Sequence, residues 1–288
     1  MAIKTNSAGI ITHNSEVFSE RGRSFGIAAL AGQPVGMRAS PVVLGGGAPD
    51  VLLLSETILA DKSPTYLFDY TSLDNLGSDS ATLVASSLYD TPVPTPDTSL
   101  PGLSGYMEVN DDTDAAYVTS NYSKINKSQD RSFLVVFKVV TQATTSSKVI
   151  MSGAENTNSV AHQIWSISDY LNLRYYGGGS LSTGNHTDGG TAEGAQVNND
   201  TLYIVCLSYD YSAATMTCRW KKTGDRAGHS FKTYAASNST TTGAVTLRFI
   251  GYSSTFNVLK TVRHYMGTLY NSQTTEQEFE NYCSILEL

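Results

Sequence analysis

One stretch of this sequence constrains the fold more than any other: the run Arg131-Ser-Phe-Leu-Val-Val-Phe-Lys-Val-Val140. It is rich in β-branched and aromatic residues, which favour strands. Apolar residues occupy both alternating sets of positions, so both faces of the strand need to be covered. The run therefore predicts the central strand of a layered β-structure, in which one set of positions lines the core between two sheets: Phe133, Val135, Phe137 and Val139.

Further short strands are expected along the chain, separated by glycine, proline and polar residues as in all-β proteins. Segments 201–210 and 215–221 flank the turn Tyr211-Ser-Ala-Ala214 and predict a hairpin. The segment Thr91-Pro-Val-Pro-Thr-Pro96 is expected to be irregular and exposed, because proline cannot join a central ladder. The other expected strands cover residues 66–70, 105–110, 148–153, 162–167, 171–176, 246–251 and 264–271.

A short helix is expected near the C-terminus, over residues 275–286. Thr275 and Glu278 have the spacing of a capping box, in which each side chain satisfies a free backbone amide. Residues Glu276, Glu278 and Glu280 could also be read as a glycosidase carboxylate cluster, but residues two apart on a helix point in different directions. The buried face of this helix is expected to consist of Phe279, Tyr282, Cys283 and Leu286.

Composition excludes several classes of function. The net charge is −7, and the acidic excess falls on residues 61–288, which argues against binding of nucleic acid or an anionic membrane. No apolar run approaches the length of a membrane span, and the N-terminus lacks the apolar core of a secretory signal, so folding in a cytosol is expected. Cys206, Cys218 and Cys283 are expected to be buried free thiols, with a Cys206–Cys218 bridge across the hairpin as the alternative.

Residues 1–61 differ from the rest of the chain. They are rich in glycine and small residues, and no hydrophobic periodicity lasts long enough to build a core. They are more hydrophobic than a typical disordered tail. We interpret them as an extended N-terminal arm that anchors the protein to a partner subunit. A disordered leader, or strands added to the main domain, are the alternatives.

The ordered set of strands in residues 62–288 resembles a laminin-G-like, or concanavalin-A-like, lectin domain. The resemblance rests on the central strand, on the hairpin that begins at Thr201, and on the closing pattern Ile250-Gly251 and Met266-Gly267 followed by a helix. It departs from the family after the hairpin, where Lys222-Thr-Gly-Asp replaces the usual Asn-Gly, and in the longer segment 72–103. The resemblance implies an antiparallel, two-sheet β-sandwich of jelly-roll type that binds ligands at its loop rims or on its concave face.

The glycine-rich loop from Tyr176 to Gly190 is the predicted glycan site. Loops on rigid sandwiches often carry recognition, and aromatic rings can stack on a sugar whose hydroxyls bond to amides and carboxylates. The alternative is a hairpin tip without a role. The candidate ligand-binding residues are Tyr175, Tyr176, Asn185, His186 and Asp188.

The acidic turn with Asp111, Asp112 and Asp114 is the candidate metal site. Calcium needs several hard oxygens from one flexible loop, and some laminin-G-like domains bind calcium near such turns. Acidic β-turns are also common without any metal, because aspartate bonds its own backbone. No other cofactor is expected.

No catalytic motif stands out. The sequence lacks a nucleophile elbow, a Walker loop and a Cys-x-x-Cys pair, and its histidines have no metal-ligand spacing. The glucanases that share this sandwich carry Glu-x-Asp-x-x-Glu on one strand, a pattern that no expected strand contains. We therefore expect a protein that is not an enzyme, with a polysaccharide hydrolase on the same fold as an alternative.

A lectin-like domain normally acts outside cells, yet an export signal is not expected here. A virus particle is assembled inside the cell and released by lysis, and the composition resembles that of phage head and tail accessory proteins. We expect a virion structural protein, either a capsid decoration or a tail appendage, that contacts other virion proteins through residues 1–61. A homo-oligomer would display the sandwich for adhesion to glycans or host surfaces. A purely structural subunit clamp is the alternative.

Overall fold

The computed structural model describes residues 52–85, 93–109, 116–120, 129–141, 148–152, 162–167, 170–175, 184–187, 198–225, 230–235, 245–250 and 261–288, together with short strands near the N-terminus. The chain divides into two compact units, residues 1–50 and 51–288. The described part of the first unit forms three antiparallel pairs: β1 (Lys4–Thr5) with β2 (Ile11–Thr12), β3 (Val17–Glu20) with β4 (Arg23–Gly26), and β5 (Ala29–Leu30) with β6 (Gln33–Pro34).

The boundary between the units lies at residue 50, whereas the sequence placed it at residue 61. The difference comes from helix α1 (Leu54–Lys62), which the sequence analysis assigned to the arm. Leu54 and Ile58 are fully buried in the core of the second unit. Residues 51–61 therefore belong to the sandwich, and the expected anchoring role concerns the segment before them.

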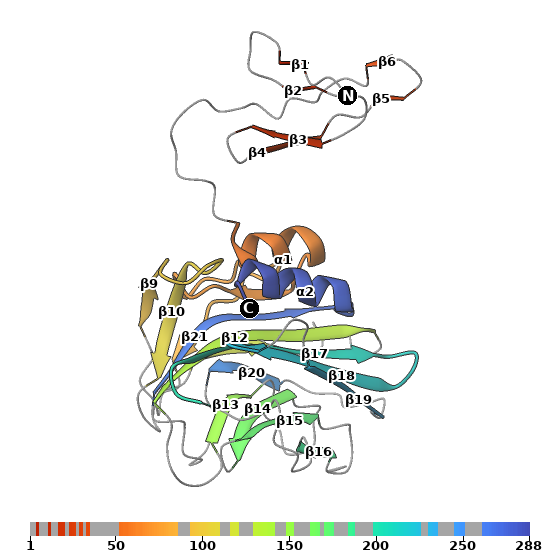
Figure 1. Ribbon diagram of the computed structural model, residues 1–288. Coiled ribbons are helices and arrows are strands. Elements are labelled where there is room, and N and C mark those ends of the chain that lie inside the picture. Colours follow the sequence, from red (N-terminus) through yellow and green to blue (C-terminus); the bar gives the residue numbers. More distant parts are fainter. Residues whose placement is uncertain are drawn as a thin grey trace. The chain divides into compact units, whose positions relative to one another are not determined.

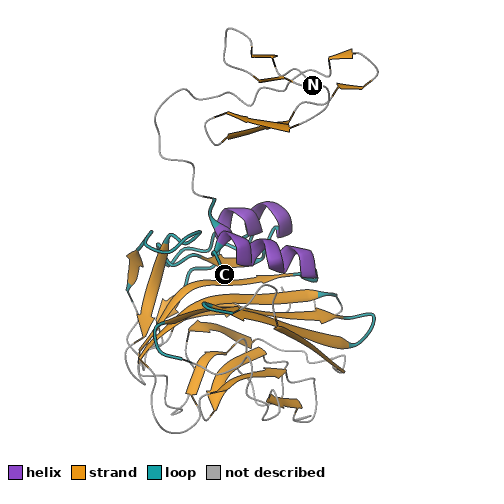
Figure 2. Cartoon of the chain, in the orientation of Figure 1, coloured by secondary structure: helices purple, strands orange, loops and turns teal. Residues whose placement is uncertain are grey.

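One large antiparallel sheet organises the second unit (Figures 1 and 2). Its central strands are the predicted ones, and the strand Tyr66–Phe68 pairs with the strand Thr261–Tyr270 beside the strand Gly105–Val109. The strand order is β19 (Ser230–Ala235), β18 (Thr215–Lys222), β17 (Thr201–Asp210), β12 (Arg131–Thr141), β21 (Thr261–Tyr270), β10 (Gly105–Val109) and β9 (Pro94–Pro96), with β7 at Tyr66–Phe68.

Two smaller antiparallel sheets lie on one side of the large sheet, and the two helices lie on the other (Figure 1). The first has the order β20 (Val245–Ile250), β11 (Ala116–Ser120) and β8 (Val84–Ala85). The second has the order β13 (Lys148–Ser152), β14 (His162–Ile167), β15 (Tyr170–Tyr175) and β16 (Gly184–Thr187). The helices are α1 and α2 (Glu276–Ile285). The expected antiparallel β-sandwich with a short C-terminal helix is confirmed.

Strand β12 has two covered faces, as its sequence predicts. Phe133, Val135, Phe137 and Val139 belong to the core between the sheets. Leu134 and Val136 belong to a second core beneath the helices, with Ile58 and Phe279. Phe249 on β20 packs against the large sheet, because the centroid of its ring lies 4.9 Å from that of Phe68 and 5.9 Å from that of Phe133.

Helix α2 begins as its sequence predicts. The Thr275 hydroxyl accepts a hydrogen bond from the Glu278 amide, the Glu278 carboxylate accepts one from the Thr275 amide, and the predicted apolar face is buried. Helix α1 has no side-chain cap at Leu53, so tertiary packing supplies its stability.

Two local expectations are resolved by the strand register. Residues 94–96 form the edge strand β9, so the proline-rich segment is not irregular throughout. Proline is tolerated there because an edge strand has one unpaired side. Cys206 pairs with Arg219 and Cys218 with Leu207, which places the two thiols in different cores, and both are free.

Candidate functional site

The predicted glycan residues that the structure describes lie on two paired strands. Tyr175 ends β15 and pairs with Gly184 of β16, while Asn185 pairs with Arg174 and His186 with Leu173. Strand β16 is the edge strand of its sheet. Residues 184–187 are thus strand residues, whereas the sequence analysis read residues 176–190 as one loop.

The register separates two of the candidates. Because successive residues of a strand alternate between its faces, Asn185 and His186 belong to opposite faces of β16, while Tyr175 shares a face with His186. Tyr176 and Asp188 lie outside the described residues, as do the calcium candidates Asp111, Asp112 and Asp114. Among the side chains that are described, no three His, Cys, Asp or Glu residues gather as a metal site.

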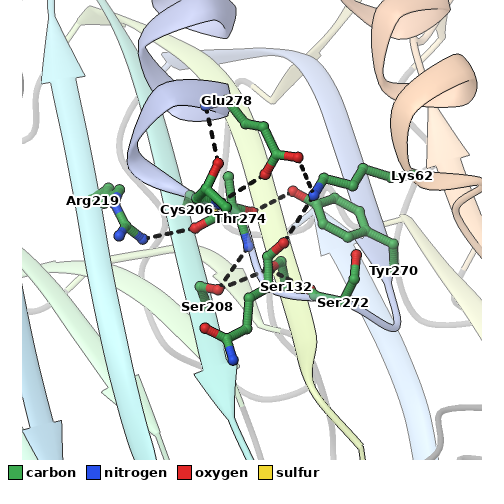
Figure 3. Close-up of polar contacts among 11 residues, drawn as sticks. Lys62, Ser132, Cys206, Ser208, Arg219, Tyr270, Ser272, Thr274 and Glu278 are labelled. Carbon is green, nitrogen blue, oxygen red and sulfur yellow. Dashed lines mark hydrogen bonds and ion pairs between the residues drawn. The ribbon is translucent and has the colours of Figure 1, made fainter.

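A buried polar cluster joins α2 to the large sheet (Figure 3). The Thr274 hydroxyl lies 3.2 Å from the Cys206 thiol and 2.5 Å from the Tyr270 hydroxyl. The Thr274 amide donates to Ser208 Oγ at 3.0 Å, and the Thr274 carbonyl accepts from Arg219 Nη1 at 3.0 Å. All the hydrogen-bonding groups of Thr274 are satisfied, which fixes the segment before α2 against strands β17 and β18.

The same cluster extends to α1 and β12. Ser132 Oγ lies 3.0 Å from Ser208 Oγ and donates to the Ser272 carbonyl at 2.8 Å. Lys62 Nζ forms an ion pair with Glu278 at 2.7 Å and donates to the Gln273 carbonyl at 2.9 Å (Figure 3). The lysine of α1 therefore bonds both the N-terminus of α2 and the segment that leads into it.

This cluster contains hydroxyls, a thiol and a lysine, but these groups stabilise the fold and are not placed to react with a ligand. Burial raises the pKa of the Cys206 thiol to about 11, so it remains protonated and unreactive near neutral pH. Burial likewise raises the pKa of the Cys283 thiol to about 12. Ser132, Ser208 and Thr274 are at most 3% exposed, so a substrate has no access to their hydroxyls.

A row of charged side chains crosses the helix-side face of the large sheet where that face is partly exposed. Strand register places Lys138 of β12 directly opposite Arg263 of β21, and Arg263 directly opposite Glu108 of β10. Arg263 Nε donates to Glu108 Oε2 at 2.7 Å, and Lys138 Nζ lies 2.7 Å from Asp200 Oδ1. We call Asp200, Lys138, Arg263 and Glu108 the charged row.

Two tyrosines flank the charged row. The guanidinium carbon of Arg263 lies 4.6 Å from the centroid of the Tyr106 ring, a cation–π contact. The Tyr106 and Tyr265 rings lie 5.7 Å apart and are tilted by 55°. Tyr265 is buried, whereas Tyr106 is partly exposed. The two cations and two carboxylates of the charged row therefore lie beside an accessible aromatic ring, that of Tyr106.

The cations shape the electrostatics around them. A hydrogen bond from Lys138 holds the pKa of Asp200 below its ordinary value. Hydrogen bonding from Ser99, with a smaller contribution from Arg263 and Lys138, lowers the pKa of Asp97. Asp97 and Asp200 are therefore ionised at neutral pH.

Sequence reasoning did not identify the charged row. Each member is an isolated polar residue in or beside a strand, which by itself indicates only a solvated position. The single signal was Lys138, which interrupts the otherwise apolar run of β12.

No family model and no curated protein matches the sequence. The fold is similar to the binding domain of Paraclostridial Mosquitocidal Protein 1, with a TM-score of 0.52, 11% identity, and 79% of this chain aligned to 53% of that chain. It is also similar to the binding domain of botulinum neurotoxin serotype D, with a TM-score of 0.51, 9% identity, and 80% of this chain aligned to 52% of that chain.

This chain thus spans about half the length of these two chains. At these identities the likeness establishes the β-sandwich fold alone. Neither described helix has the length and apolar character needed to cross a lipid bilayer.

Proposed function

We propose that this protein binds glycans through its β-sandwich and does not catalyse a reaction. The observation that carries the proposal is the charged row with Tyr106 beside it. Sugar recognition uses an aromatic ring for the apolar face of the pyranose and a few placed polar groups for its hydroxyls. Tyr106, Glu108 and Arg263 supply these groups on adjacent strands.

The scaffold supports recognition by such a surface. Strands β12 and β21 are covered on both faces over most of their length, so the backbone beneath the row is held by two cores. A site on rigid strands loses little conformational entropy on binding. The two solved structures named above, of a botulinum neurotoxin and of Paraclostridial Mosquitocidal Protein 1, are themselves binding domains.

A second location for the site is the β15–β16 pair, with Tyr175 and His186 on one face. The two locations make different predictions. Replacement of Tyr106 by threonine keeps a good strand former on β10 and removes the ring. Replacement of Tyr175 by threonine does the same on β15.

Binding of the full chain to an immobilised glycan library, with wild type and both variants, tests the proposal. We expect loss of binding for Tyr106→Thr by about tenfold or more, with Tyr175→Thr as the matched control. Loss with Tyr175→Thr alone would move the site to the β15–β16 pair. If wild type binds no glycan, or releases sugar from a polysaccharide, the proposed function is wrong.

The biological setting that we propose is a phage particle, as a capsid decoration or tail appendage anchored by the N-terminal segment. A composition rich in glycine, threonine, serine and tyrosine supports it, and weak single sites become effective when many copies are displayed. Co-sedimentation of the tagged protein with purified particles tests the setting. Removal of residues 1–50 should abolish co-sedimentation without loss of glycan binding.

A further inference from the structure

The charged row contains an arrangement that the fold does not need. Lys138 and Arg263 are directly opposite each other on neighbouring strands, and opposed like charges destabilise a sheet. Their partners stand at the outer ends of the row: Asp200 beside Lys138 and Glu108 beside Arg263. The centre of the row is therefore positive, and its two ends are negative.

Among the residues that the structure describes, both cations have fewer hydrogen-bond partners than donors. A lysine ammonium has three donors and an arginine guanidinium has five. Asp200 is the hydrogen-bonding partner of Lys138 in the described part of the chain, while Arg263 bonds Glu108 and interacts with Tyr265. Several N–H groups of two adjacent cations thus remain for a ligand.

Both side chains are also accessible without being fully solvated. The side chain of Lys138 is 22% exposed and that of Arg263 is 34% exposed. Partial burial strengthens an ionic hydrogen bond relative to one in bulk water. An anionic group placed between the two cations would gain from both and relieve their mutual repulsion.

We infer that the charged row binds a carboxylated sugar, with its carboxylate between Lys138 and Arg263. The inference rests on the proposed glycan-binding function and names the class of glycan. The oxygens of Glu108 and Asp200 that are not engaged by the cations accept the sugar hydroxyls, which a simple inorganic anion would not supply. The ring of Tyr106 lies beside the site on the Arg263 side.

Uronic acids and sialic acids share this chemistry, so the experiment includes both. The full chain is titrated with trigalacturonate, sialyllactose and the neutral sugar lactose by calorimetry or NMR at low salt. We expect at least one acidic ligand to bind about tenfold or more tightly than lactose, since hydrogen bonds between charged groups exceed neutral ones. The preference should decrease as salt is raised, because partly exposed charges are screened.

Lys138→Gln and Arg263→Gln should each reduce the preference for the acidic sugar over lactose by about tenfold. Arg263→Lys should restore part of the loss because it keeps the charge. Lys222→Gln, which removes a cation from β18, is the matched control and should bind as wild type. Thermal midpoints verify that each variant is folded. If Arg263→Gln does not fold, Lys138→Gln and the salt dependence of acidic-sugar binding still test the inference.

Equal affinity for acidic and neutral sugars, or acidic-sugar binding that survives Lys138→Gln, would overturn the inference while the glycan-binding function stood. Binding of none of the sugars here and of no glycan in the library would overturn both.

Discussion

The sharpest prediction concerns His264, a histidine buried in the core between the sheets. Its side chain is 2% exposed, and strand register places it opposite Met107 and Phe137. Its Nε2 atom has no hydrogen-bond partner among the described residues. Desolvation of the imidazolium lowers the pKa of His264 to about 3. The folded protein therefore keeps this imidazole neutral at any mildly acidic pH.

The direction of the pH effect follows from the two states. In the unfolded chain the histidine pKa is about 6.5, so the unfolded state takes up the proton first as the pH falls. The free energy of unfolding therefore keeps its full value above that pKa. It decreases progressively as the pH falls from there towards the folded pKa of about 3. Between pH 7 and pH 5 this linkage removes about 2 kcal/mol from the free energy of unfolding.

His264→Gln provides the comparison, because glutamine is polar, similar in size and neutral throughout this range. Urea unfolding of both proteins at pH 7, 6 and 5 gives the free energy of unfolding at each pH. The variant is less stable or equal at pH 7, but wild type should lose about 2 kcal/mol more than the variant by pH 5. The other histidines titrate alike in both proteins and cancel. Parallel pH profiles would show that His264 is hydrated or paired in the folded state, and the reasoning would fail.

Three further predictions concern the two cores. Phe137→Ala removes a ring stacked 5.2 Å from that of Tyr203 and should cost about 3–5 kcal/mol of unfolding free energy in urea; a loss below about 1 kcal/mol would misplace β12. A chain of residues 51–288 should keep the thermal midpoint of the full chain, whereas a chain of residues 64–288 lacks α1 and should melt at a clearly lower temperature. Equal midpoints for the two truncated chains would show that α1 belongs to the arm. Thr274→Val should lower the free energy of unfolding in urea by about 1–3 kcal/mol, and Thr274→Ser should be close to wild type. Equal stability of Thr274→Val and wild type would show that the polar cluster does not contribute to stability.

The elements that sequence predicts well are those in which local pattern and tertiary environment agree. The run around Phe137 is apolar at both alternating sets of positions, and both faces are buried. Helix α2 carries its own capping box and a regular apolar face, so its start was predictable from Thr275 onward. Helix α1 lacks a side-chain cap, and its burial of Leu54 and Ile58 depends on strands much later in the chain. The sequence analysis assigned this helix to the arm, which is wrong, because these distant contacts leave no local pattern in the sequence.

The charged row could not be predicted because strand register creates it. Lys138, Arg263 and Glu108 are far apart in sequence, and only the antiparallel pairing of β12, β21 and β10 brings them into one line. The loop candidates were favoured for the opposite reason, since glycine-rich segments are conspicuous in sequence whatever they do. Of those candidates, Tyr175 and His186 are brought to adjacent strands, and the register separates Asn185 from them by face.

The stability of Lys138→Gln distinguishes a row kept for the fold from one kept for a ligand. The substitution removes the repulsion with Arg263 and an ion pair with Asp200, whose side chain is 81% exposed. An exposed ion pair contributes little to stability, and an opposed like-charge pair costs a similarly small amount, so the two effects offset each other. We expect the free energy of unfolding in urea to stay within about 0.5 kcal/mol of wild type, while acidic-sugar affinity is lost. Such a separation is typical of residues retained for function at no gain in stability. A loss above about 1 kcal/mol would instead make Lys138 a structural cation, and the row would then be a solvated end of the sheet.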